Sequence, residues 1–119
     1  MILYGIANCD TVAKARAWLS QAGMTYEFHD YKKAGVDPLR LTGWCDALDW
    51  EKVLNRAGTT FKKLPDAEKV GLTRDKAVTL MLAAPSLIKR PILEHPGGLL
   101  LGFKADVWAE ALISNSAQG

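Results

Sequence analysis

Residues 2–19 constrain the fold more than any other part of the chain. A short apolar run at 2–6 leads into a loop and then into a single cysteine, Cys9. Beyond the cysteine, apolar residues recur at the spacing of one helix face, and they are Val12, Ala15, Leu19 and Ala22. This order predicts a strand, a loop, a cysteine and then a helix that is capped by Asp10 or Thr11.

The predicted position of Cys9, just ahead of a helix, has a chemical consequence. The first N–H groups of a helix are unpaired and lie at the positive end of its dipole, so they favour an anion. That anion is either the thiolate of Cys9 or a bound oxyanion. A small buried residue without chemistry is the plain alternative for a cysteine at this place.

A second strand completes a βαβ unit. Gly23 is a typical helix stop, and residues 25–31 alternate in the manner of a strand. Such units have parallel strands and a right-handed connection, and ligands collect at the carboxyl ends of the strands. Cys9 lies at that end of the first strand.

The rest of the chain predicts helices followed by a hairpin. Asp37 and Pro38 indicate the start of a helix with Leu41, Trp44, Cys45 and Leu48 on its apolar face, and residues 32–36 before it indicate a polar loop. Further starts at Asp49, at Thr59 or Thr60, and at Thr73 make 37–88 helical. Residues 91–94 and 99–103 predict a β-hairpin around a turn at 95–98, and a last helix over 105–113 precedes a frayed tail at 114–119. The expected fold is α/β, a four-stranded mixed sheet with a helical insertion at about 37–88.

Composition bounds the class of protein. The chain has 119 residues, 49% of them hydrophobic and 24% charged, which is typical of one soluble domain spanning 1–119. No apolar run approaches the length of a membrane span, and the N-terminus lacks the basic region of a secretory signal, so we expect a cytoplasmic protein with no membrane partner. A net charge of +2 gives no basis for direct nucleic-acid binding.

Several kinds of cysteine site are excluded by spacing. A phosphatase loop needs arginine six positions after the cysteine, where this chain has Ala15, and a CxxC dithiol needs cysteine where it has Val12. Cys9, His29, Cys45 and His95 lack the paired spacing of a structural zinc site, so we expect no metal. A single thiolate that is resolved by an outside thiol remains, and Cys45 is expected to be structural.

Several segments resemble the arsenate reductase and Spx family, most closely its YffB-like branch. They are ANCDT at 7–11, KARAWL at 14–19, HDY at 29–31, LNRAGTTFKKL at 54–64, MLAAPSLIKRPIL at 81–93 and LLLGF at 99–103. The resemblance covers nearly the whole chain in order and spacing. It implies a thioredoxin-like fold with a helical insertion and a thiol reductase activity that uses glutathione as co-substrate.

The resemblance also implies roles for individual residues. Cys9 matches the catalytic cysteine, and Arg56 and Arg90 match two arginines that bind the oxyanion. Lys104 stands where arsenate reductases have a third arginine, and lysine is a point charge rather than a bidentate fork. The remaining residues expected to bind substrate or glutathione are Asn8, Asp10, Thr11 and Pro91. Because Pro91 opens a strand after a basic residue, the bond before it is a candidate for the cis form.

Three functions follow as hypotheses. The first is an enzyme in which Cys9 attacks a small oxidised or mixed-disulfide substrate and glutathione resolves the product. The second is an Spx-like regulator that docks on RNA polymerase, although Val12 stands in place of the second cysteine of that group. The third is a member of the fold that only binds a partner.

Overall fold

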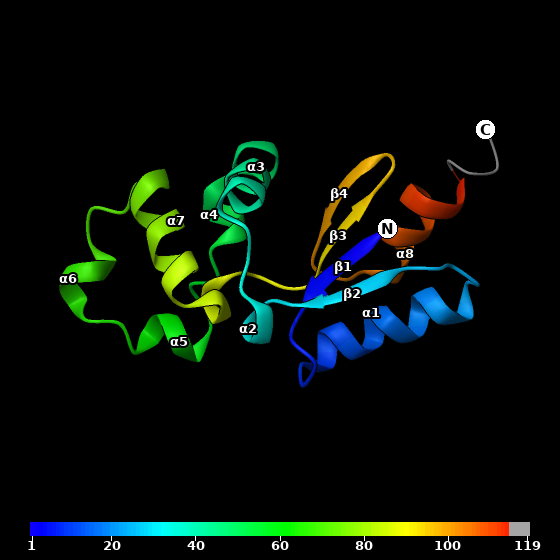
Figure 1. Ribbon diagram of the computed structural model, residues 1–119, viewed down its shortest axis with the longest axis horizontal. Helices are drawn as coiled ribbons and strands as arrows, with labels where there is room; N and C mark the ends of the chain where they lie inside the picture. Colours follow the sequence, from blue (N-terminus) through cyan, green and yellow to red (C-terminus); the bar gives the residue numbers. More distant parts are fainter. Residues whose placement is uncertain (115–119) are drawn as a thin grey trace. The chain divides into compact units, whose positions relative to one another are not determined.

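The computed structural model describes residues 1–114, so residues 115–119 of the predicted tail lie outside the described part. Two units make up the chain, and each is described by itself (Figure 1). The sheet unit comprises Met1–Asp30 and the segment from Arg90 onward, and the helical unit comprises Tyr31–Lys89.

The sheet unit contains a four-stranded mixed sheet. Its strands are β1 (Ile2–Gly5), β2 (Glu27–Asp30), β3 (Ile92–His95) and β4 (Gly98–Leu101). They are ordered β2-β1-β3-β4, with β1 parallel to β2 and antiparallel to β3, which is antiparallel to β4. The predicted fold class is therefore confirmed, including the βαβ unit and the hairpin.

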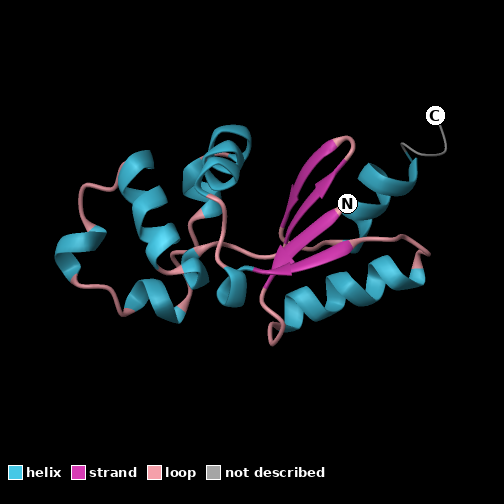
Figure 2. Ribbon diagram, viewed as in Figure 1, coloured by secondary structure: helices cyan, strands magenta, loops and turns pink. Residues whose placement is uncertain are grey.

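Two helices cover one face of this sheet (Figure 2). They are α1 (Asp10–Gln21) and α8 (Ala105–Ala109), and α8 continues as the π-helical turn η2 (Glu110–Ser114). The core between the helices and the sheet consists of Leu3, Ala15, Leu19, Leu93, Trp108 and Leu112. The predicted inner face of α1 is largely confirmed, but Ala22 is exposed because α1 ends at Gln21 and Gly23 takes a positive φ of 72°.

The hairpin is tighter than predicted. β3 extends to His95 and β4 begins at Gly98, so two residues connect the strands instead of four. The N–H of Gly97 donates to Nδ1 of His95 at 3.2 Å, which closes the turn. β4 ends at Leu101 rather than at residue 103, because Gly102 has a φ of 72° and its carbonyl accepts a hydrogen bond from the indole of Trp108.

The helical unit has one longer helix at each end of a series of short ones. Its elements are α2 (Tyr31–Ala34), α3 (Pro38–Leu48), α4 (Trp50–Val53), α5 (Thr59–Lys62), α6 (Asp66–Lys69), α7 (Arg74–Ala83) and the 3₁₀ turn η1 (Pro85–Leu87). α3 packs against α4 and α7, and α7 also contacts η1. The buried side chains of this unit are Tyr31, Leu41, Trp44, Cys45, Val53, Leu54, Ala77, Met81, Leu87 and Ile88.

The predicted helix starts at Asp37, Asp49 and Thr73 are confirmed, and Thr73 caps α7 by accepting a hydrogen bond from the N–H of Lys76. α5 begins at Thr59, so Gly58 occupies the capping position that we predicted for Thr59 or Thr60. Leu48 is half-buried rather than part of the core, and α6 was not predicted.

The polar loop that we predicted at 32–36 is wrong in its first half. Tyr31–Ala34 forms a single helical turn, closed by a hydrogen bond from the N–H of Gly35 to the carbonyl of Tyr31. The reason is tertiary, because the ring of Tyr31 is buried and its hydroxyl donates to the carbonyl of Ile88 at 2.9 Å. β2 consequently ends at Asp30.

No helix within residues 1–114 combines the length and the apolar content needed to cross a membrane.

Candidate functional site

Cys9 occupies the N-cap position of α1. Its backbone is extended, with φ −105° and ψ 127°, and its carbonyl accepts the N–H of Ala13 at 2.9 Å. The prediction that Asp10 or Thr11 caps this helix is wrong, because both residues already lie within the first turn. This position places the cysteine beside the N–H groups that the first turn of the helix leaves unpaired. The residue is also partly exposed, so reagents can reach it.

The surroundings of Cys9 shift its pKa. Burial alone would raise the pKa of the thiol, but this effect is outweighed. The backbone N–H of Val12, the side chain of Arg90 and the N–H of Thr11 all form hydrogen bonds to the sulfur, and the charge of Arg90 adds to them. The net result is a lowered pKa for Cys9 and hence a larger thiolate fraction at neutral pH.

The register of the sheet explains why Arg90 reaches Cys9. β3 runs antiparallel to β1 with Ile92 opposite Tyr4, so Arg90 precedes β3 at the end of the sheet where β1 leads into the cysteine loop. Arg90 is half-buried, and the peptide bond between Arg90 and Pro91 is cis. Pro91 is buried, and its carbonyl accepts the N–H of Gly102 at 2.8 Å.

Two further contacts hold the loop that carries Cys9. The carboxylate of Asp30, at the end of β2, accepts the N–H of Ala7 at 3.3 Å. The N–H of Cys9 itself donates to the carbonyl of Ile6 at 3.3 Å. The loop that follows β1 is therefore also attached to the carboxyl end of β2, and Cys9 lies at the carboxyl end of the first strand as predicted.

Other predicted site residues of the sheet unit are exposed. Asn8 and Asp10 flank Cys9 on the surface, and Thr11 acts on the sulfur through its backbone. Lys104 is exposed at the N-cap of α8, and no interaction joins it to Cys9 within the described residues. Of the two predicted cations in the described part of the sheet unit, Arg90 is thus the one that contacts the cysteine.

Arg56 belongs to the helical unit, so its role at the Cys9 site stays a prediction. It follows a segment in which Leu54 pairs with Ile88 and the N–H of Asn55 donates to the carbonyl of Leu87 at 2.7 Å. Its guanidinium lies 5.6 Å from the ring centroid of Trp50 and 3.8 Å from a carboxylate oxygen of Glu51. The side chain is 46% exposed, so it keeps access to solvent.

Cys45 differs from Cys9 in its burial and in the direction in which its pKa is shifted. It is buried on the inner face of α3, where burial raises the pKa of its thiol. The prediction of a structural role agrees with this placement. Within residues 1–114 there is no group of three or more His, Cys, Asp or Glu side chains that could hold a metal ion.

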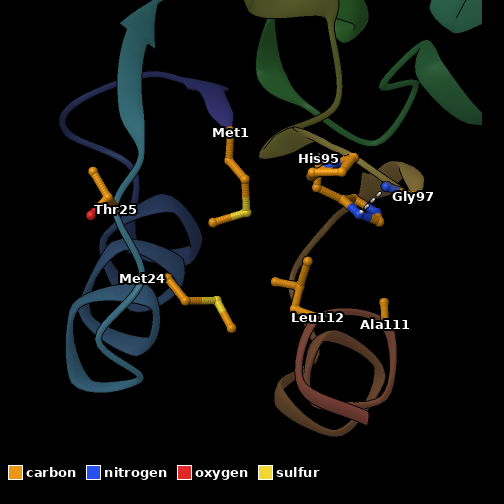
Figure 3. Close-up of a pocket in the computed structure, with 8 residues that line it drawn as sticks. Met1, Met24, Thr25, His95, Gly97, Ala111 and Leu112 are labelled. Carbon is orange, nitrogen blue, oxygen red and sulfur yellow. Dashed lines mark hydrogen bonds between the residues drawn. The ribbon is translucent and has the colours of Figure 1, made fainter. Parts of the chain in front are cut away.

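A cavity of about 410 Å³ lies at the other end of β1 (Figure 3). It is lined mainly by apolar side chains, with Met1 and Met24 on one side and Ala111 and Leu112 on the other. His95 also lines it, and burial lowers the pKa of that imidazole. Because Met1 precedes β1 and Cys9 follows it, the cavity is separate from the cysteine site.

Two residues of the Cys9 site escaped the sequence analysis. They are Val12, as a backbone donor, and Asp30. Each acts through a contact that depends on the direction of the backbone or on a turn. The spacing of apolar residues, which predicts helices and strands, gives no indication of such contacts. The HDY segment at 29–31, which contains Asp30, was the one available indication.

Known proteins are similar to this chain over most of its length. The chain is 38% identical over 101 residues to an uncharacterized protein of Haemophilus influenzae, covering 85% of this chain and 89% of that protein. It is 26% identical over 104 residues to the global transcriptional regulator Spx of Streptococcus mutans, covering 83% and 73% of the two chains.

Two solved structures are similar over nearly the full length. The structure of YffB (PA3664) has a TM-score of 0.90 and 55% identity, and it covers 93% of this chain and 97% of its own. An arsenate reductase (ArsC) related protein from Brucella melitensis has a TM-score of 0.73 and 47% identity, with 94% and 93% covered. The ArsC family model matches residues 4–111, a range that includes Cys9, Arg56, Arg90 and Lys104, and the chain therefore belongs to the ArsC family.

Proposed function

We propose that this protein is a glutathione-coupled thiol reductase in which Cys9 is the single nucleophile. The observation that carries the proposal is the set of donors on the sulfur of Cys9, namely two backbone N–H groups of α1 and the side chain of Arg90. These donors favour the thiolate, and the thiolate is the form that attacks a disulfide. Membership of the ArsC family, and similarity to an arsenate reductase related protein, support the same reaction class.

The reaction has two displacement steps. The thiolate of Cys9 attacks the glutathione sulfur of a mixed disulfide, the disulfide bond breaks, and the substrate leaves as a thiolate that takes up a proton. Cys9 is now joined to glutathione. The thiolate of a second glutathione attacks the glutathione sulfur of this adduct, which releases oxidised glutathione and restores the Cys9 thiolate. In the complete cycle the mixed disulfide is reduced by one glutathione thiol, and oxidised glutathione is made of that glutathione and the one that the mixed disulfide carried.

The cations have separate tasks in this scheme. Arg90 stabilises the Cys9 thiolate before attack and again when it departs as the leaving group. Arg56 and Lys104 bind anionic groups of the substrate or of glutathione, and Asn8, Asp10, Thr11 and Pro91 line the place where glutathione lies. A carboxylate suits these cations because charge-assisted hydrogen bonds are about twice as strong as neutral ones.

The test is covalent and direct. Reduced protein is incubated with oxidised glutathione, and the intact mass is measured for the wild type, Cys9→Ser and Cys45→Ser. We expect one glutathione on the wild type and on Cys45→Ser, no adduct on Cys9→Ser, and removal of the adduct by reduced glutathione. A wild type that forms no adduct would contradict the proposal.

An Spx-like regulator that binds RNA polymerase is the second candidate. The similarity to the Spx regulator of Streptococcus mutans favours it. The two candidates differ in their partners, because the regulator would bind RNA polymerase whether or not Cys9 can form an adduct. Pull-down of purified RNA polymerase by wild type and by Cys9→Ser, with no adduct in the mass experiment, would favour the regulator.

A further inference from the structure

The side chain of Arg56 is contacted from two sides by consecutive residues of α4. Its guanidinium carbon lies 5.6 Å from the centroid of the Trp50 ring, within the range of a cation–π contact. Its Nη2 atom lies 3.8 Å from Oε2 of Glu51. One face of the cation therefore lies against an aromatic ring while a carboxylate approaches it.

The backbone explains why both residues point to the same cation. α4 begins directly after Asp49, which has a φ of 79° and accepts the N–H of Glu51 through its carboxylate at 3.2 Å. This turn orients Trp50 and Glu51 together. Arg56 lies in the short loop between α4 and α5, where the amide of Asn55 is close enough to Gly58 that a Cβ placed there would lie 2.8 Å from its Nδ2.

The contact with Glu51 is loose. A separation of 3.8 Å is too long for a hydrogen bond, and the side chains of Arg56 and Glu51 are 46% and 60% exposed. An exposed ion pair of this kind favours the paired state by no more than about five-fold. A ligand carboxylate that forms two short parallel hydrogen bonds with the guanidinium has the stronger interaction.

We propose that Trp50, Glu51 and Arg56 form a carboxylate-exchange site. Trp50 holds the guanidinium, Glu51 occupies the anion position in the free protein, and a carboxylate of a peptide thiol displaces Glu51 on binding. The proposal rests on the proposed function, to which it adds the ligand group that Arg56 recognises and an internal competitor for it. Glu51 therefore lowers the affinity for glutathione and for other carboxylates.

The experiment separates binding from chemistry. Full-length protein carrying Cys9→Ser is titrated with S-methylglutathione, which retains both carboxylates and cannot form a disulfide. The Nε–H signal of Arg56 and the indole signal of Trp50 are followed by NMR. The variants are Glu51→Gln, Trp50→Leu, Trp50→Phe and Arg56→Ala, and Glu68→Gln is the matched control, since it removes one exposed carboxylate elsewhere in the helical unit.

Glu51→Gln is expected to bind about two- to five-fold more tightly than the parent, and Glu68→Gln equally to it. Trp50→Leu is expected to bind about two- to five-fold more weakly, while Trp50→Phe retains most of the affinity. Arg56→Ala loses at least about ten-fold. Unchanged affinity in Glu51→Gln would overturn the proposal, as would equal binding of the diethyl ester of S-methylglutathione. Absence of any binding would also overturn it. The proposed function has its own test, which is formation of the glutathione adduct on Cys9.

Discussion

Gly5 at the end of β1 and Val12 in the first turn of α1 lie so close that no side chain fits between them. A Cβ placed on Gly5 would lie 2.8 Å from Cγ2 of Val12, which is fully buried. Because valine is branched at Cβ, its methyl groups cannot swing away. The contact fixes where α1 begins and thus where the N–H of Val12 meets the sulfur of Cys9.

Gly5→Ala is accordingly expected to displace the first turn of α1. We expect a loss of about 1–3 kcal/mol of unfolding free energy and a raised pKa for Cys9, measured by urea denaturation and by the pH dependence of iodoacetamide alkylation. Val12→Ala removes the obstructing methyl groups, so the double variant should be more stable than the sum of the single changes predicts. If the changes in unfolding free energy of the two single variants simply add up in the double variant, the side chain of Val12 does not clash with the new Cβ at residue 5.

The two thiols should react at different pH. The pKa of Cys9 is lowered by hydrogen bonds from Val12, Arg90 and Thr11 in spite of burial, and burial raises the pKa of Cys45. The thiolate is the reactive form, so alkylation of Cys9 should reach half its maximal rate at a lower pH than alkylation of a free cysteine, and alkylation of Cys45 at a higher pH. Mass-resolved labelling of Cys9→Ser and Cys45→Ser measures each thiol alone. Superimposable profiles would refute this prediction.

Arg90 and Arg56 should respond differently to removal. Arg90→Ala deletes a hydrogen bond and a charge from the sulfur of Cys9, so the pKa of Cys9 should rise, and a half-buried side chain is lost from the fold. Arg56→Ala removes a largely exposed cation and should leave the melting temperature nearly unchanged while weakening substrate binding. Arg90→Lys keeps the charge, so the pKa of Cys9 in this variant should lie between its values in the wild type and in Arg90→Ala. If the pH dependence of Cys9 alkylation is the same in Arg90→Ala as in the wild type, Arg90 does not stabilise the thiolate.

Lys104 should limit the use of arsenate. An oxyanion held by three arginines loses one bidentate contact at this position, which corresponds to about 1.5–3 kcal/mol, or about one to two decades of affinity. We expect slow arsenate turnover by the wild type, faster turnover by Lys104→Arg, and little change with a glutathione mixed disulfide. Lys14→Arg on the exposed surface of α1 is the control. Efficient arsenate reduction by the wild type, with no gain in Lys104→Arg, would remove lysine as the determinant of substrate choice.

Local patterns were sufficient for the strands and the longer helices of the fold. The apolar residues Val12, Ala15 and Leu19 predicted the buried face of α1, and Asp37, Asp49 and Thr73 marked helix starts that the structure retains. These signals are local because a cap or a helix face is decided within a few residues. The same locality led to the wrong loop at 32–36, where burial of Tyr31 against a distant carbonyl decides the conformation.

The sequence by itself therefore determined the order of the strands, the longer helices and the place of Cys9 before a helix. The tertiary structure alone decided which groups act on that cysteine. The antiparallel register of β1 and β3 brings Arg90 to Cys9 across 81 positions of chain, and the turn at Asp49 brings Trp50 and Glu51 to Arg56. Hydrogen bonds and charge contacts act over a few ångströms, and only the packed chain places residues distant in sequence within that range.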